Sequence, residues 1–402
     1  MTSEPWNAKK EWREGRITSS NLLGLIFLIV FSSFWNLISF PIAIISIPEA
    51  YQKEDWSVFI VLIFPLIGII TIIWMVYEIL RYIKYGSSVF EMSKVPGIIG
   101  GKLEGKIIAK TKIKPDEGFV LSLICIHQKV TGSGKHRKIE EKNLWQDEKI
   151  ISYSECEILN KGFSIPVTFG IPFEVKETRD INAGEKILWR LKVLASTPGV
   201  DYDCQFEVPV FKTNESKLDF KIDENKDMQH ELKLDINQVC RQEKIIIEQS
   251  IHGGMTFIPS CIKNIVTQLA FTFFAIFWTA IVAVMYMNKV PSFLTSIFGI
   301  FDLIILYGVL DMWLYRNYFE IRGRTLRTYN GYLGFGSVID LKNSEILEIT
   351  KKEHSRSGAN INYNIIVKAS NQNKEIILVR LINSLTHIEY IINFLKKELN
   401  LK

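Results

Sequence analysis

Four long apolar runs limit what this chain can fold into. Two of them, Ile265–Met287 and Ser292–Trp313, are separated only by Asn288-Lys289-Val290-Pro291. Each holds about 22 residues, and a helix of that length crosses the roughly 30 Å hydrocarbon core of a bilayer. Two similar runs, Leu22–Ile47 and Ser57–Leu80, lie near the N-terminus. The sequence therefore predicts a membrane α-helical protein with four transmembrane helices in two hairpins.

Charges that flank these runs predict their orientation. The short connections inside the hairpins are acidic or nearly uncharged, whereas basic residues lie outside them at Arg81, Lys84, Lys263 and Arg316. By the positive-inside rule, both termini and all large soluble parts are expected on the cytoplasmic side of a bacterial inner membrane. The first run is longer than a signal-peptide core and lacks a small-residue cleavage site, so we expect it to be retained.

Composition and motif content argue against several classes of function. A net charge of +5 on 402 residues, without a concentrated basic face, argues against a nucleic-acid binder. The five cysteines stand singly without a C-x-x-C pair, and the six histidines have no metal-ligand spacing. Neither H-E-x-x-H nor G-x-S-x-G occurs. We therefore expect no metal, no cofactor and no catalytic residue, and we classify the chain as a non-enzyme.

Residues 88–213 have the pattern of an all-β cytoplasmic sandwich. Apolar residues alternate from Ile165 to Val175, and the run 119–126 is apolar on both faces, as in a central buried strand. Turns rich in Gly and Pro separate such segments, which favours an antiparallel β-sandwich. Pro166 and Pro172 assign their part of the alternating run to an edge or a bulge.

The last part of the chain, residues 315–402, predicts a small α+β module. Six short alternating segments are followed by an amphipathic helix, for which Ser384 is a plausible N-cap. Strands closed by one C-terminal helix are the order of a pleckstrin-homology-like domain. The full plan is a cytoplasmic tail (1–20), hairpin 1 (21–84), the sandwich (88–213), a polar linker with extra strands (214–262), hairpin 2 (263–314) and the C-terminal module (315–402).

Two segments of this plan leave alternatives open. The tail carries Trp6 and Trp12, which either rest at the headgroup level or belong to a frayed tail; the sequence favours the frayed tail. Within 214–262, Glu243–Ser250 is predicted to be a strand. Whether that segment packs on the sandwich stays open.

The loop around Thr131-Gly132-Ser133-Gly134-Lys135 resembles a phosphate-binding loop only superficially. A P-loop needs Gly where Lys129 stands and Ser or Thr where His136 stands. The basic residues of this loop could contact anionic lipid headgroups, each contributing about 1 kcal/mol near an anionic surface. The alternative, which the sequence favours, is a solvated loop. The residues of this candidate contact are Lys135, His136, Arg137 and Lys138.

Asp302 is the most unusual residue inside an apolar run. A carboxylate at mid-membrane costs on the order of 3 kcal/mol and usually faces a bundle interior. Counted from the loop, Asp302 and Thr279 lie at similar depth, as does Asn36 in the first hairpin. We predict an intramembrane polar layer of these three residues, which acts either as an ion or proton site or, more in line with its composition, as a clasp between helices. Asp311 is expected at the membrane edge, within reach of Arg316 or of solvent.

Several motifs occur together in an order that resembles a family of uncharacterised proteobacterial inner-membrane proteins with a domain of unknown function. They are SVFEMSKVPGIIGGKLEG (88–105), TGSGK (131–135), LWQDE (144–148), GVDYDCQFEVPVFKT (199–213) and FGIFDLIILYGVLDMWL (298–314). The resemblance covers most of residues 20–402 and implies no known activity. The W-R-L-x-V segment at 189–193, followed by F-E-V-P-V, is also similar to arrestin-type sandwiches, whose usual work is binding proteins.

These features together favour a non-enzymatic role. We expect an inner-membrane scaffold or adaptor whose partners are the bilayer, an unidentified protein bound through the cytoplasmic sandwich, and anionic headgroups. Exposed sheet edges would allow strand addition. The alternative is a component of an envelope transport or stress system that uses the layer around Asp302.

Overall fold

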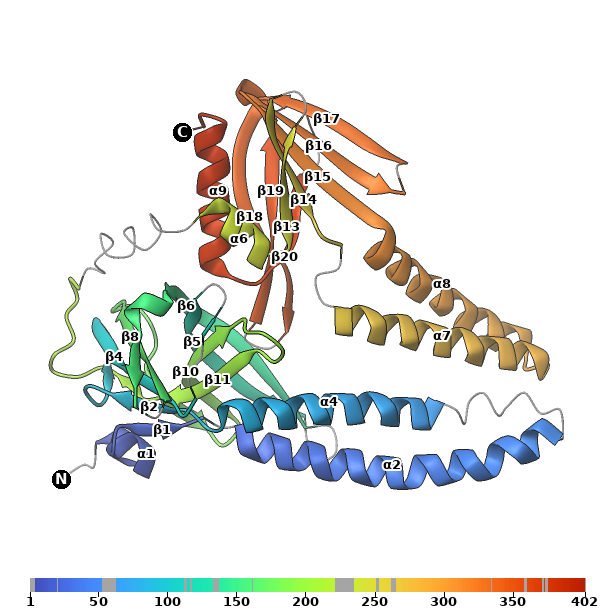
Figure 1. Cartoon of the computed structure of the whole chain (residues 1–402), viewed down its shortest axis with the longest axis horizontal. Helices are drawn as coiled ribbons and strands as arrows, with labels where there is room; N and C mark the ends of the chain where they lie inside the picture. Colours follow the sequence, from blue (N-terminus) through green and yellow to red (C-terminus); the bar gives the residue numbers. More distant parts are fainter. Residues whose placement is uncertain are drawn as a thin grey trace.

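The computed structural model describes most of the chain. The described residues are 4–19, 21–52, 63–111, 114–115, 118–132, 137–160, 162–220, 235–250, 253–261, 265–333, 335–357, 360–370, 372 and 375–401. Two β-rich modules lie beside each other, and two helical hairpins extend from them in the same direction (Figure 1).

Four helices are long and apolar enough to cross a membrane. They are α2 (Asn21–Gln52), α4 (Ile63–Tyr85), α7 (Ile265–Met287) and α8 (Ser292–Leu314). Most of their large apolar side chains are exposed, as lipid-facing side chains are in a structure described without lipid. The four predicted spans coincide with these helices, apart from residues 57–62 of the second, which lie outside the described residues.

The first module is a β-sandwich of two antiparallel sheets. One sheet has the order β1-β2-β4-β8-β7, and the other has the order β11-β10-β5-β6, with β9 beside β10. Their bounds are β1 (Arg16–Thr18), β2 (Val89–Met92), β4 (Gly101–Ala109), β5 (Phe119–Thr131), β6 (Lys138–Ile151), β7 (Glu157–Leu159), β8 (Gly162–Ile171), β9 (Arg179–Asn182), β10 (Glu185–Ala195) and β11 (Tyr202–Val208). A short parallel pair, β3 (Gly97–Ile98) and β12 (Val210–Phe211), closes one end.

Period-2 alternation explains why these strands share one core. Inward residues of both sheets, such as Phe169 and Trp189, are fully buried in one cluster. Burying each large apolar side chain contributes about 1.5–3 kcal/mol. Pro166 lies in the part of β8 beyond its short pairing with β7, where a missing N–H removes no ladder hydrogen bond on that side.

The N-terminal segment is part of this sandwich, which corrects the expectation of a frayed tail. Helix α1 (Lys10–Arg13) follows the 3-10 turn η1 (Pro5–Asn7), and β1 pairs with β2 through Ile17 and Phe90. Trp12 is only 6% exposed, and its indole N–H donates to the carbonyl of Glu207 at 3.0 Å. Its burial rules out the headgroup position as well.

The second module combines two sheets and two helices around another core. Its five-stranded sheet is β13-β14-β15-β16-β17, and its three-stranded sheet is β18-β19-β20. The bounds are α6 (Ile236–Gln242), β13 (Ile245–Ser250), β14 (Gly254–Pro259), β15 (Tyr315–Arg322), β16 (Thr325–Tyr332), β17 (Phe335–Lys342), β18 (Ile346–Ser357), β19 (Asn360–Ala369), β20 (Ile376–Ile382) and α9 (Leu385–Glu398). The predicted cap is present: the Ser384 side chain accepts from the backbone N–H of His387.

The described residues of 235–261 belong to this second module, whereas Lys217 donates its backbone N–H to Gly100 of the first module at 3.0 Å; residues 221–234 of the open segment 214–262 lie outside the described residues. Val239 of α6 and Phe257 of β14 are fully buried in its core. Strand β14 pairs with β15, and the rings of Phe257 and Phe319 stack 4.8 Å apart. Hairpin α7–α8 is therefore inserted between two neighbouring strands of one sheet, and α8 passes directly into β15.

Candidate functional site

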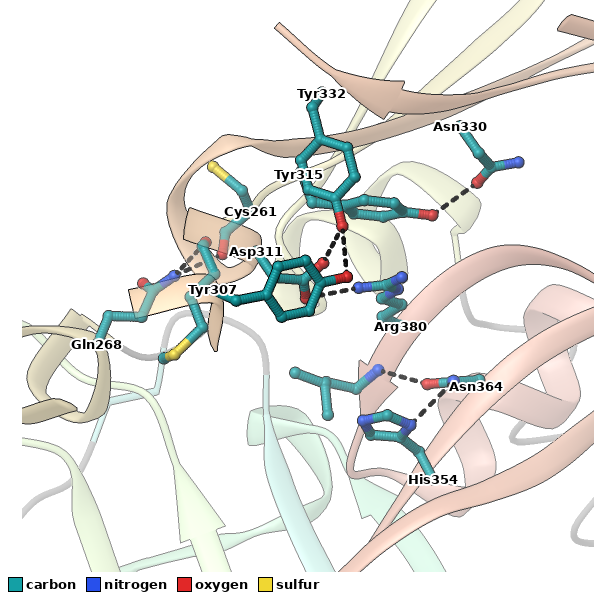
Figure 2. A network of polar contacts seen from close by, with 12 residues as sticks. Cys261, Gln268, Tyr307, Asp311, Tyr315, Asn330, Tyr332, His354, Asn364 and Arg380 are labelled. Carbon is teal, nitrogen blue, oxygen red and sulfur yellow. Dashed lines mark hydrogen bonds and ion pairs between the residues drawn. The ribbon is translucent and has the colours of Figure 1, made fainter. Parts of the chain in front are cut away.

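A polar cavity of about 570 Å³ lies where hairpin α7–α8 joins the second module. The start of α7, the end of α8 and the adjoining ends of β15, β18 and β20 all contribute to its lining. Figure 2 shows that its side chains come from segments far apart in the sequence and point toward one another. We call it the junction pocket, and its principal polar residues are Gln268, Asp311, Tyr315, His354 and Arg380.

Asp311 is the centre of the network beside this pocket. Its Oδ2 lies 3.2 Å from Nη1 of Arg380, and the Tyr332 hydroxyl donates to its Oδ1 at 2.6 Å. This hydrogen bond is the main cause that raises the pKa of Tyr332. The expected neighbour Arg316 instead donates to the carbonyl of Trp313. Asp311, expected within reach of Arg316 or of solvent, thus pairs with Arg380 and ties α8 to β20.

Arg380 also stacks on an aromatic ring. Its guanidinium carbon lies 3.6 Å from the ring centroid of Tyr315, and the hydroxyl of that tyrosine donates to Asn330 at 2.9 Å. Burial raises the pKa of Tyr315, so its hydroxyl stays protonated as a donor. Planar guanidinium groups suit such combined ion-pair and stacking positions, where lysine would not.

Irregularities in two neighbouring strands aim side chains into the pocket. The register of β19 with β20 shifts between Tyr363 and Ile365, and Leu381 adopts a left-handed backbone with φ of 59°. The side-chain oxygen of Asn364 accepts from the backbone N–H of Leu381 at 3.1 Å, and its amide nitrogen lies 3.3 Å from the ring of His354. Such bulges re-aim side chains and are over-represented beside functional sites.

Gln268 joins the two helices at the pocket wall. Its amide donates to the carbonyls of Cys261 and Met312, at 2.8 and 3.0 Å. Among the residues that the structure describes, its Oε1 and the Nε of Arg380 are buried without a hydrogen-bond partner. An unpaired buried polar group costs about 1–3 kcal/mol, so these two atoms lower the stability of the pocket wall.

Within the described ranges, no group of three or more His, Cys, Asp or Glu side chains could hold a metal ion. Burial raises the pKa values of Cys125, Cys156 and Cys204 to about 12, so these thiols stay protonated and unreactive at neutral pH.

The intramembrane residues predicted from the sequence fall into two clusters. The Thr279 hydroxyl donates to Oδ1 of Asp302 at 2.7 Å, and Asp302 is 8% exposed. Asn36 instead donates to the carbonyls of Ser32 and Gly68, at 2.7 and 3.2 Å. The described contacts thus bring Asp302 and Thr279 together within the second hairpin and place Asn36 in the first.

Two of the four residues predicted to contact lipid headgroups lie among the described residues. Lys135 and His136 lie outside the described residues, whereas Arg137 and Lys138 are exposed at the start of β6. The Thr131 hydroxyl lies 3.3 Å from Oε1 of Glu140 in the same hairpin.

A polar contact that the sequence did not predict joins the two modules. The Glu148 carboxylate of β6 accepts from the Ser384 hydroxyl, and its backbone carbonyl accepts from Thr386 at 3.2 Å. Burial raises the pKa of Glu148 despite these hydrogen bonds. Nearby, the ring of His387 lies 2.7 Å from Glu243. Ser384 was predicted as a helix cap, but its contact with Glu148, 236 residues away in the sequence, has no local sequence signal.

Comparison with known proteins assigns this chain to no family. No family model matches it, and no curated protein matches it. Among solved structures, it is similar to the sporulation control protein Spo0M from Bacillus subtilis, with 10% identity, a TM-score of 0.22, and coverage of 64% of this chain and 90% of that one. A TM-score this low supports no inference on fold or function.

Proposed function

We propose that this chain is a non-enzymatic scaffold of a bacterial inner membrane, with both β modules on the cytoplasmic side, and that it binds a partner protein through the sandwich. The basic residues that flank both hairpins support this orientation. The common direction in which the hairpins extend from the modules supports placing both modules on one side (Figure 1).

The observation that carries the proposal is the position of β6. It spans Lys138–Ile151 and is the outermost described strand of its sheet, paired on one side with β5. Its first half is exposed, and Ile139 keeps 60% of its surface accessible. An open edge of this kind is a template for strand addition by an extended peptide, and the charges along it prevent self-pairing.

The second half of the same strand is occupied within the molecule. There Glu148 contacts Ser384 and Thr386 at the N-terminus of α9. A peptide added to the first half of β6 would therefore end beside the contact between the modules. This arrangement gives the scaffold a binding edge whose occupation is transmitted to the C-terminal module.

The junction pocket adds a second binding element on the hairpin side of that module. Its lining includes Asp311, His354 and Arg380, whose charged and polar side chains suit a polar ligand. In this proposal the pleckstrin-homology-like order of strands and helix serves binding, as the sequence pattern of 315–402 leads us to expect.

The alternative, an envelope transport or stress component that uses the Asp302 layer, receives less support. The described contacts of Asp302 and Asn36 stay within separate hairpins. A continuous polar path would need them to meet. We favour a clasp, and a variant Asp302→Leu that keeps its fold but loses ion flux would contradict this preference.

Site-specific photo-crosslinking of the full chain in its native membrane tests the scaffold. We expect a crosslinker at Ile139 on β6 to give a discrete protein adduct. The matched control is a crosslinker at Ile158 on β7, also an exposed isoleucine on an edge strand at 55% accessibility. Equal adducts from both sites, or none from Ile139, would contradict strand addition at β6.

A further inference from the structure

The turn between β16 and β17 carries exposed apolar side chains that no part of the described molecule covers. Leu333 and Phe335 are 68% and 85% exposed, and Val338 on the same strand is 47% exposed. The segment from Tyr332 to Ile339 contains no charged residue. Phe and Leu side chains exposed together at a hairpin tip are typical of an interaction surface rather than of ordinary solvent-facing sequence.

The position of this tip relative to α8 identifies its surroundings. Helix α8 ends at Leu314, β15 begins at Tyr315, and Tyr315 pairs with Tyr332. The hydroxyls of Tyr307 and Tyr332 lie 3.5 Å apart. The Tyr332 hydroxyl therefore reaches back along the last two turns of α8, while its backbone stays level with Tyr315, the first residue after the helix. The adjoining tip thus lies close to the end of α8 from which β15 begins (Figure 1).

The residues around the tip have the composition of a membrane interface. Tyr307, Trp313, Tyr315 and Tyr332 gather at this end of α8. Tyr and Trp rings prefer the headgroup level, whereas Phe and Leu prefer the acyl boundary. An open strand edge cannot enter the hydrocarbon core because its backbone groups would stay unpaired. Only the side chains at the tip can enter, to the shallow depth that an interfacial segment reaches.

We propose that the β16–β17 tip inserts Leu333 and Phe335 into the acyl boundary of the bilayer that α7 and α8 span. The inference rests on the proposed membrane location of that hairpin. The tip then acts as a third attachment of the second module, beside the two helix ends. It fixes the tilt of the module on the membrane surface and so fixes the direction in which the junction pocket opens.

Quenching by lipids with brominated acyl chains tests the insertion. The full chain, reconstituted in phospholipid vesicles, carries a genetically encoded environment-sensitive fluorescent residue at one position at a time. We expect the probe at Phe335 to lose most of its fluorescence to lipids brominated near the headgroup end of the chain. The matched control is Leu347 near the start of β18, which follows the far end of β17; it is 70% exposed and should lose none.

A probe at Leu303, in the middle of α8, combined with lipids brominated near the methyl end of the chain, separates this proposal from the membrane location on which it depends. Quenching at Leu303 but not at Phe335 would overturn the tip insertion alone. No quenching at Leu303 would overturn the location of the hairpin itself. A Phe335 probe shielded from both bromolipid and a water-soluble quencher would show that protein covers the tip, and this too would overturn the proposal.

Discussion

The two hairpins are alike in length and hydropathy but differ in how they are held together. Hairpin α2–α4 is inserted between the paired strands β1 and β2, and its two helices meet through a cluster of neutral polar groups around Asn36 and Thr71. Hairpin α7–α8 is likewise inserted between β14 and β15, but the polar contact between its helices includes an acid, Asp302, which accepts from Thr279.

The closest approach at a glycine also differs in kind. A Cβ added at Gly68 would lie 2.2 Å from Oδ1 of Asn36, whereas one added at Gly308 would lie 3.2 Å from a ring carbon of Phe271, and one added at Gly299 meets nothing within 4 Å. Small residues let helices approach closely and form interhelical hydrogen bonds. The first hairpin therefore combines its close approach with its polar cluster, whereas the second separates the two.

The largest expected effect comes from breaking the ion pair that links the second hairpin to β20. Arg380→Met removes the ion-pair partner of Asp311, and the two side chains are 29% and 30% exposed. We expect the free energy of unfolding of the C-terminal module to fall by about 2–3 kcal/mol, measured by chemical denaturation in detergent. The control Arg327→Met breaks the exposed pair with Asp340, 3.7 Å apart, and should cost less than about 1 kcal/mol. Equal losses would remove the special role of the junction.

Close packing of the first hairpin is tested by a pair of matched glycine substitutions. Gly68→Ala forces Asn36 out of its hydrogen bonds with α4, and we expect a loss of about 2 kcal/mol. Gly299→Ala adds a methyl group to open space and should be neutral or slightly stabilising, because Ala favours helix over Gly. Thermal unfolding in bicelles measures both. If Gly299→Ala proved as damaging as Gly68→Ala, the contrast between the hairpins would fail.

Replacement of Asp302 tests the clasp within the second hairpin. Asp302→Leu removes the hydrogen bond from Thr279, and we expect a loss of about 1 kcal/mol, which is modest because the sheet still holds the helix ends. Asp302→Asn keeps an acceptor for Thr279 and should be nearly neutral. The same thermal assay, combined with ion flux in vesicles, checks both variants. A larger loss for Asn than for Leu would argue that the charge itself matters.

The smallest expected effect concerns the contact of Glu148 with Ser384 and Thr386, which joins the two modules. Burial raises the pKa of Glu148 above its ordinary value of 4.5. Its protonated form is therefore favoured by folding, and its contribution to stability is full below that ordinary value and is lost as pH rises through the raised pKa. We expect Glu148→Gln to remove this dependence and to hold the modules together at neutral pH. Energy transfer between labelled modules across a pH series measures it, and an unchanged profile in the variant would assign the dependence to another group.

Local patterns predicted the elements well because their causes are local. Length and hydropathy define the four helices, alternation defines strands such as β8, and a side-chain hydrogen bond at Ser384 begins α9. The orientation of the helices across a membrane and the layout of the domains stay predictions.

What escaped prediction depends on contacts between distant residues. Asp311 was expected beside Arg316, yet its partner Arg380 lies on another strand, and a backbone bulge at Leu381 aims it there. Trp12 reads as a tail residue because nothing nearby in the sequence signals the sandwich core that buries it. Likewise, pairing of β14 with β15 across an inserted hairpin has no short-range signal.

That insertion has a consequence for biogenesis. When the ribosome has completed β14, its pairing partner β15 is still unmade, and in the proposed membrane location the two ends meet only after both helices have been threaded into the bilayer. A hairpin inserted with one helix left outside would strand β14 and β15 on opposite sides, and the five-stranded sheet could not close. The sheet can therefore be completed only after the hairpin has been inserted correctly. A chain with an incorrectly inserted hairpin keeps an open β-edge of the kind that quality-control proteases and chaperones recognise.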